Sequence, residues 1–279
     1  MKYLKYFKTD VDRQNYFSSD KFVTPNVSYA EDADIVYFKP YTDDLIIMTS
    51  KSNPEVMKVC YNQGWAASSD KMYASEAARV TSIGTAFKGL GNGDSDGYGY
   101  DSPNTSFTFS FDEFKYFTGV TSIDENAFYR SNIVSITIPD SVTFIDKYAF
   151  EGCKSLPVED NLRYADTYLV EAVDNSLNAY TIKEGTKWIG ESAFYVCYNL
   201  TSITIPDSVT SIGEEAFYKC SKLNEITCLA TTAPSIYGST FLSIKSNGTL
   251  SVPVGSDYSS WMSTGNFYLG KYNWTTEEF

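Results

Sequence analysis

Hydrophobic and polar positions follow a pattern that returns along much of the chain. Residues 201–220 read TSITIPDSVTSIGEEAFYKC, and residues 134–153 read VSITIPDSVTFIDKYAFEGC. Within residues 201–220, Ile203 and Ile205 alternate with polar neighbours, which predicts a strand with one apolar face. A single turn of this kind cannot bury its apolar face alone. The recurrence therefore predicts a solenoid of stacked turns around one continuous core.

Each copy contains three further pieces after the strand. The Pro206–Ser208 stretch ends the strand and turns the chain. Val209 and Ile212 then mark a second extended side and are expected to point inward. Ala216 and Phe217 complete the turn in a tight helical bend, where alanine allows close stacking and phenylalanine fills the core.

The recurring Ala-Phe pair sets the length of one turn. Its phenylalanine stands at Phe87, Phe128, Phe150, Phe194 and Phe217. The spacings are 41, 22, 44 and 23 residues, so one turn takes 22–23 residues and the spacing of 44 is two turns. We expect an α/β solenoid over residues 80–229 with about six turns. It contains a Gly-rich insertion at 89–103 and a degenerate double turn at 154–180.

Residues 1–79 carry no copy of the repeat and are expected to form an N-terminal α/β cap. A hairpin is predicted at 27–38 and a strand near 45–48. Asn53 followed by Pro54 predicts the start of a helix, because proline is favoured in the first helical turn.

The repeat ends after residue 229, and residues 230–279 are expected to form a C-terminal cap. A strand is predicted at 251–254 and a short helix at 258–262. The end of a solenoid exposes an apolar rung and an open sheet edge, so a divergent closing segment is expected there.

Composition and charge narrow the function. The net charge of −13 would be repelled by nucleic acid or by an anionic membrane. The chain has no histidine, which removes imidazole bases, histidine-dependent nucleophile systems and histidine metal sites. Its 23 tyrosines suit recognition of sugars or proteins, although tyrosine also serves as a spacer on a repeat surface.

Three of the five cysteines share one repeat position. Cys153, Cys197 and Cys220 each follow an Ala-Phe pair by three residues. A position beside a stacked core favours a small apolar residue, and a free cysteine serves as one. A Cys197–Cys220 bridge is the alternative, because adjacent turns lie roughly 4.8 Å apart. The lack of a C-x-x-C motif argues against zinc.

The repeat pattern L-x-x-I-x-I-P-D-S-V-T-x-I-G-x-x-A-F-x-x-C closely resembles the BspA-type leucine-rich repeat family of bacterial surface proteins. The resemblance covers residues 80–229, in which 111–119 resembles the usual lead-in to the first full repeat. The segment at 248–256, together with Trp261 and residues 269–274, resembles a common closing segment of the family. It implies a leucine-rich repeat right-handed β-solenoid. It also implies a secreted or surface-displayed adhesin that binds host matrix proteins or other cells, although a fold does not dictate a ligand.

The start of the chain bears on localisation. Its first ten residues lack the apolar core and cleavage site of an export signal, and the chain has no apolar run long enough for a membrane-spanning segment. The protein is therefore either intracellular or a mature or truncated chain from which an export signal has gone. The family resemblance favours a secreted or cell-surface protein.

A segment near the N-terminus resembles a degenerate EF-hand-like calcium loop. In many relatives the region matching 65–77 carries several acidic ligands, whereas only Asp70 and Glu76 are carboxylates here. Calcium needs six to eight oxygen ligands. The resemblance therefore implies a loop that has lost its metal.

The insertion contains a weak calcium candidate. Asn92, Asp94 and Asp96 match the first half of an EF-hand loop, with glycine in the following position. The twelfth position is Pro103 where a glutamate is expected. A calcium site therefore competes with a plain Gly/Asp loop, and Ca²⁺ is the one cofactor considered.

Neighbouring carboxylates at Asp112–Glu113 and Glu214–Glu215 are the only catalytic candidates. The second pair occupies a position that other turns fill with different residues, such as Glu125 and Lys147. Such variation within one chain is typical of solvated surface. We therefore expect a protein that is not an enzyme.

The outward positions of the repeat strands form a polar strip that is the candidate ligand-binding surface. Its members are Ser135, Thr137, Thr181, Ser202, Thr204, Glu225 and Thr227. The strip is either the wet face of a sheet or a platform for protein contact. We expect a non-catalytic protein that binds host or bacterial proteins. The alternatives are a carbohydrate-binding module that uses tyrosine and tryptophan, such as Trp261 and Trp274, and a structural spacer of a larger surface protein.

Overall fold

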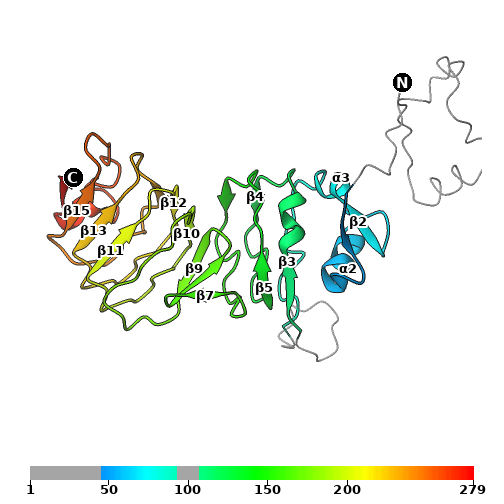
Figure 1. Cartoon of the computed structure of the whole chain (residues 1–279). Coiled ribbons are helices and arrows are strands. Elements are labelled where there is room, and N and C mark those ends of the chain that lie inside the picture. Colours follow the sequence, from blue (N-terminus) through cyan, green and yellow to red (C-terminus); the bar gives the residue numbers. More distant parts are fainter. Residues whose placement is uncertain (1–44, 93–106) are drawn as a thin grey trace, which may run out of the picture. The chain divides into compact units, whose positions relative to one another are not determined.

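The computed structural model describes residues 45–92 and 107–279 (Figure 1). The chain divides into two compact units. The N-terminal unit holds the described residues up to Ser82 together with 113–121 and 139–141, and the repeat unit holds the remainder. The two units are described separately below.

The N-terminal unit combines a two-stranded antiparallel sheet with a short helix. Strand β1 (Ile46–Thr49) pairs antiparallel with β2 (Lys71–Tyr73), and helix α2 (Pro54–Asn62) lies between them in the sequence. The short helix α3 (Ala74–Ala77) follows β2 directly. The predicted strand and the predicted start of the helix are both confirmed, whereas the hairpin predicted at 27–38 lies outside the described residues.

A hydrogen bond and an aromatic contact connect segments of the N-terminal unit that are distant in sequence. The 3₁₀ helix η3 (Asp112–Tyr116) brings Glu113 to Asn53, whose side-chain amide donates a hydrogen bond of 3.2 Å to the carboxylate. The rings of Trp65 and Phe117 meet edge to face, with their centroids 6.1 Å apart. These contacts join the helix region to the segment at 113–121.

Four parallel strands form the first side of the repeat unit (Figure 1). They are β11 (Ser202–Ile205), β13 (Glu225–Cys228), β15 (Thr249–Val252) and β16 (Thr275–Glu278). In the register, Ser202 pairs with Glu225, Glu225 with Thr249 and Thr249 with Thr275, which are 23, 24 and 26 residues apart. Each strand therefore belongs to one turn of the repeat.

A second ladder of parallel strands forms the other extended side. Its strands are β9 (Tyr168–Ala172), β10 (Trp188–Ile189), β12 (Ser211–Ile212) and β14 (Ser235–Ile236). Trp188 pairs with Ser211, and Ser211 with Ser235, at spacings of 23 and 24 residues. The chain thus crosses from one side to the other within every turn.

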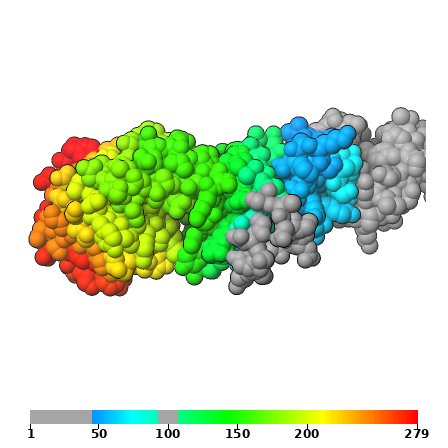
Figure 2. Space-filling view, turned by 90° about the horizontal axis from the view of Figure 1, so that it is seen from below, coloured from blue at the N-terminus to red at the C-terminus, as the bar shows by residue number. Residues whose placement is uncertain are grey.

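Two further parallel pairs belong to earlier turns. They are β3 (Phe109–Phe111) with β5 (Ile133–Ile136), and β4 (Ser122–Ile123) with β6 (Phe144–Ile145). The predicted β-solenoid of leucine-rich repeat type is confirmed, with about seven turns of about 24 residues and little helix. That is one turn more than the sequence predicted. Successive turns follow one another in sequence order along the surface of the repeat unit (Figure 2).

One phenylalanine from each regular turn stacks in the core of the repeat unit. Phe87 lies 5.2 Å from Phe128, and Phe128 lies 5.1 Å from Phe150, measured between ring centroids. The column continues with Phe194 and Phe217, which are 5.2 Å apart and nearly parallel. The Ala-Phe pair therefore does what its position in the repeat predicted.

The cysteines of the shared repeat position are buried free thiols, as are the other two cysteines of the chain. The Cys153 thiol donates to the carbonyl of Phe128 at 2.9 Å, and the Cys220 thiol donates to that of Phe194 at 3.2 Å. Burial raises the pKa of the Cys153 thiol to about 12. The prediction of a packing role is confirmed, and the alternative Cys197–Cys220 bridge is not formed.

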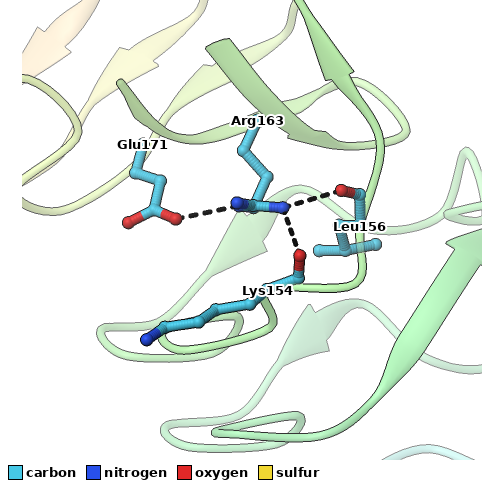
Figure 3. Close-up of polar contacts among 4 residues, drawn as sticks. All are labelled: Lys154, Leu156, Arg163 and Glu171. Carbon is cyan, nitrogen blue, oxygen red and sulfur yellow. Dashed lines mark hydrogen bonds and ion pairs between the residues drawn. The ribbon is translucent and has the colours of Figure 1, made fainter. Parts of the chain in front are cut away.

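The degenerate double turn at 154–180 replaces repetition with a local antiparallel sheet. Strand β7 (Val158–Glu159) pairs with β8 (Leu162–Ala165), which pairs in turn with β9. Figure 3 shows the Arg163 side chain that holds this segment. Its guanidinium contacts Glu171 Oε1 at 2.8 Å and donates to the carbonyls of Lys154 and Leu156 at 2.5 and 2.8 Å.

The end of the chain differs from the prediction in two places. The strand predicted at 251–254 is β15, shifted two residues toward the N-terminus, and β16 was not predicted. Residues 258–262 form turns in place of the predicted helix. The physical reason is packing, because the buried ring of Trp261 lies on Phe241 with centroids 5.4 Å apart, and this contact outweighs local helical preference.

Candidate functional site

The outward positions of the four-stranded sheet form two columns that run across the strands. One column contains Ser202, Glu225, Thr249 and Thr275, and the other contains Thr204, Thr227, Ser251 and Glu277. Thr181 extends the second column, because it forms a parallel bridge with Thr204. We call these nine residues the polar sheet face.

The alternation of side chains along each strand produces this face. Ile203, Ile226 and Leu250 lie between the two columns and are buried in the core. Their neighbours on the polar sheet face are exposed or half-buried. Neighbours within a column are about 4.8 Å apart, and the two columns are about 7 Å apart, as the geometry of parallel strands requires. The result is a regular array of hydroxyl groups with a carboxylate in each column.

The structure brings together five of the seven residues that the sequence proposed for the binding strip. Thr181, Ser202, Thr204, Glu225 and Thr227 all belong to the polar sheet face. It adds Thr249, Ser251, Thr275 and Glu277, which the sequence reasoning missed. The alternation of polar and apolar residues at 249–252 was a usable signal for two of them, whereas β16 carries no apolar alternation.

Ser135 and Thr137 lie elsewhere. Ser135 belongs to β5, which pairs with β3 and not with the four-stranded sheet, and Thr137 follows that strand. The Ser135 hydroxyl donates a hydrogen bond of 3.1 Å to Asp112 Oδ2. The Ser135 hydroxyl is therefore used in a contact with the preceding turn, apart from the polar sheet face.

The metal candidates give no assembled site in the part of the chain that is described. Asn92 is half-buried, while Asp94 and Asp96 lie outside the described residues. Within 45–92 and 107–279, no three carboxylate or cysteine side chains converge closely enough to hold a metal ion. The calcium hypothesis for the insertion stays a prediction.

The loop at 65–77 is closed by hydrogen bonds of a carboxylate to the backbone. Glu76 accepts the backbone N–H of Ala67 at 3.1 Å and that of Tyr73 at 2.8 Å, one on each oxygen. Asp70 is exposed and accepts a hydrogen bond from the Ser68 hydroxyl. The two carboxylates of the resembled calcium loop thus both have protein partners.

The tryptophans proposed for sugar binding serve a different purpose. Trp261 is fully buried and Trp274 is 5% exposed. Their ring N–H groups donate to the carbonyls of Pro234 and Lys245, each at 2.8 Å. Both rings are therefore part of the core, and the suggestion that they bind a glycan is wrong. A tryptophan ring can bind a sugar only where it is exposed, and packing has buried both of these rings.

The catalytic candidates do not form a paired site. Asp112 accepts its hydrogen bond from Ser135, whereas Glu113 accepts one from Asn53. Glu214 accepts a hydrogen bond of 3.1 Å from the Ser239 hydroxyl. Neighbouring carboxylates thus have different hydrogen-bond partners.

None of the helices within the described residues has the length and apolar character of a membrane span.

The chain is similar to a leucine-rich cell surface protein from Faecalibacterium prausnitzii A2-165 of known crystal structure, at 24% identity and a TM-score of 0.31. The similarity covers 54% of this chain and 52% of that one, so the chain spans about half the length of that protein. The chain matches no curated protein.

The family model of the BspA-type leucine-rich repeat region matches in six copies, over residues 103–157 and 121–248. Together these matches span 103–248, which is 146 of 279 residues and therefore more than half of the chain. They include β3 to β14 and hence most of the stacked turns described above. The chain therefore belongs to the BspA-type leucine-rich repeat family.

Proposed function

We propose that this protein is a non-catalytic interaction protein, secreted or displayed on the cell surface, that binds a protein partner through the polar sheet face. The observation that carries the proposal is the register of the four-stranded sheet. It aligns nine outward residues from five turns into one uninterrupted array. Membership of the BspA-type leucine-rich repeat family supports the proposed location.

The array suits a macromolecular surface better than a small molecule. Five turns at about 4.8 Å per step extend over roughly 19 Å. A stable protein interface buries about 800 Å² on each partner, so the polar sheet face would form its centre and the surrounding residues its rim. Hydroxyl groups act as donors and acceptors, which lets one face adapt to a partner's backbone and side chains.

Charge indicates the chemistry of the partner. The chain carries a net charge of −13, and Glu225 and Glu277 place carboxylates directly on the polar sheet face. A basic protein surface would be attracted at long range and would pair with these carboxylates at contact. A host matrix protein with a basic segment fits this description, which is the finer part of the proposal.

A binding assay with a charge-reversed variant tests the proposal. We expect the protein to bind at least one member of a panel of purified matrix proteins, measured by surface plasmon resonance at physiological salt. Glu225→Lys should weaken binding about tenfold, because it places a like charge against the basic partner. Glu184→Lys makes the same charge change on an exposed residue outside the polar sheet face and should bind as the wild type does.

Two results would contradict the proposal. One is an equal loss of binding in both variants, which would indicate a net-charge effect without a defined site. The other is retention of full binding by Glu225→Lys, which would move the interface away from the polar sheet face.

A further inference from the structure

A hollow of about 80 Å³ lies in the repeat unit beside the short strands β6, β10 and β12. Two successive turns have glycine directly after their short strand, at Gly190 and Gly213, and both glycines line the hollow. The equivalent residues after β6 and β14 are Asp146 and Tyr237, which carry side chains. The two glycines contribute backbone to the lining, which we call the floor of the hollow, and the side chains of neighbouring residues line the rest.

The glycines of the floor have no room for a larger residue. A Cβ atom at Gly190 would lie 2.6 Å from the hydroxyl oxygen of Tyr168, and one at Gly213 would lie 2.5 Å from the backbone nitrogen of Glu191. Both distances are shorter than real Cβ contacts. The floor of the hollow is thus closely packed backbone, and its shape is determined by the stacking of the turns.

Aromatic rings line the hollow. Tyr168 and Trp188 belong to its wall and are themselves almost fully buried, whereas the ring of Tyr237 is 44% exposed. Rings of this kind present a negative face to a cation, and the attraction grows when water is excluded. The wall is therefore suited to a flat or compact cationic group.

Three carboxylates also line the hollow, those of Asp146, Glu191 and Glu214. Glu191 Oε2 is buried and has no hydrogen-bond partner among the described residues. Burial raises the pKa of Glu191, the Tyr148 hydroxyl acts in the opposite direction, and the charge of Glu214 raises it further. A buried carboxylate oxygen without a partner is costly, so a donor that reached it would be bound with a substantial gain.

The lysine that lines the hollow balances this charge only in part, because the positive charge of Lys147 lowers the pKa of Glu191 but acts against three carboxylates. Lys147 Nζ lies 3.7 Å from Glu125 Oε1, and both side chains are about half exposed. Three carboxylates thus face one ammonium group that already has another partner. The hollow is negatively charged, and Glu214 is held in place by its hydrogen bond from Ser239.

We propose that this hollow binds the guanidinium group of an arginine side chain on a protein partner. The guanidinium would lie over the backbone floor at Gly190 and Gly213, against the aromatic wall, and would donate hydrogen bonds to Glu191 and Glu214. Guanidinium is the cation that suits this combination, because it is planar, is weakly hydrated, stacks on rings and pairs with carboxylates through several N–H groups. This site is separate from the polar sheet face. The inference depends on the proposed protein-binding function in one respect, which is that the arginine belongs to a protein partner.

Titration with a minimal probe tests the hollow directly. N-acetyl-arginine amide is added to the full chain, and the backbone amides of Gly190, Glu191 and Gly213 are followed by NMR. We expect saturable shifts at these three amides and none at Thr204 or Thr227 on the polar sheet face. The citrulline analogue has nearly the same shape but no charge, and it should bind about tenfold more weakly or not at all.

Matched variants identify the carboxylates. Glu191→Gln and Glu214→Gln should each weaken binding of the arginine probe several-fold. Glu214 is exposed, and glutamine can still accept the hydrogen bond from Ser239, so we expect the Glu214→Gln variant to fold. Glu215→Gln removes the adjacent charge outside the lining of the hollow and should leave the affinity unchanged.

Three outcomes would overturn the inference. They are equal binding of the citrulline analogue, shifts that do not localise to the hollow, and unchanged affinity in both Gln variants. Shifts of the same amides by a neutral oligosaccharide without any response to arginine would assign the hollow to a glycan. Failure of the arginine probe leaves the matrix-protein assay with Glu225→Lys unaffected, so the two proposals are tested independently.

Discussion

The regular turns and the degenerate double turn fill the same core in different ways. In the regular turns Phe194 and Phe217 stack with an interplanar angle of 3°. The double turn contributes no phenylalanine to this column of stacked rings. A tyrosine at each end of the double turn packs on the neighbouring phenylalanine of the column instead. Tyr168 packs on Phe150 at 44°, and Tyr180 packs on Phe194 at 56°. The tilted tyrosines continue the column while sending their hydroxyl groups to polar partners.

This difference shows two sources of stability in one solenoid. A regular turn depends on a repeated apolar contact that its neighbours supply in the same form. The double turn depends on individual polar contacts, above all those of Arg163 with one carboxylate and two backbone carbonyls (Figure 3). Removing one residue from each region should therefore have effects of different size and extent.

The largest effect is expected for Phe217→Ala in the regular turns. Phe217 is fully buried between Phe194 and Phe241, at 5.2 and 5.7 Å between ring centroids. Truncation leaves a cavity in a core that stacked backbone prevents from collapsing, so the free energy of unfolding should fall by about 3–5 kcal/mol. Urea denaturation followed by circular dichroism measures this.

The neighbouring Tyr218 provides the control for that prediction. Its half-buried ring stacks on Tyr195 with centroids 4.9 Å apart at the surface. Tyr218→Ala should lower the free energy of unfolding by only about 1 kcal/mol. An equal loss in Tyr218→Ala and Phe217→Ala would mean that the phenylalanine column is not the main support of the regular turns.

A smaller and more local effect is expected for Arg163→Met in the double turn. Methionine keeps the apolar stem but leaves the carbonyls of Lys154 and Leu156 without their charged donor, at a cost of about 1–3 kcal/mol. Hydrogen exchange should quicken in β7 and β8 and stay unchanged in β13. Arg163→Lys should restore part of the protection, because one ammonium cannot replace the fork of the guanidinium. Uniform exchange changes across all turns would show that the double turn is not held separately.

The smallest effect, and one of opposite sign, is expected for Val196→Gly in a regular turn. Val196 has a φ of +63°, in the left-handed region that disfavours β-branched residues, and Gly152 occupies the same repeat position with a φ of +75°. Relief of this strain should exceed the entropic cost of glycine and raise the free energy of unfolding by up to about 1 kcal/mol.

The reverse change at Gly152 is the matched control. A Cβ there would lie 2.8 Å from Arg130 Cγ, and the positive φ would strain the backbone as well. Gly152→Val should therefore destabilise the protein in the same denaturation assay. Destabilisation by Val196→Gly would show that side-chain packing at this position outweighs the backbone strain.

Much of the repeat unit could be predicted because each regular turn contains the same pattern of strand, corner and core residues. The Ile203–Ile205 alternation, the Pro206 corner and the Phe217 position recur at one period, and the structure places them in strand, turn and core as expected. The antiparallel pairing of β7 with β8 could not be predicted, because short strands of this kind do not specify their partners.

The candidate site was predicted only in part for the same reason. Ser202 and Thr204 follow from alternation within one strand, but their alignment with Thr249 and Ser251 depends on the register between turns. For Trp261 the sequence suggested too much, because its residue type indicated a ring available for binding, whereas packing buries that ring. The hollow at Gly190 and Gly213 had no signal in the sequence beyond two glycines in the same repeat position.

The amino-acid sequence by itself determined the family, the length of a turn, the residues of the core column and the free state expected for the cysteines. These properties follow from contacts between equivalent positions, which a period reveals directly. Only the tertiary structure decided which polar residues share a face, which aromatic rings are exposed and where residues of neighbouring turns enclose a charged hollow. Those properties depend on how separate turns align and on what covers each side chain, and neither is written within a single repeat.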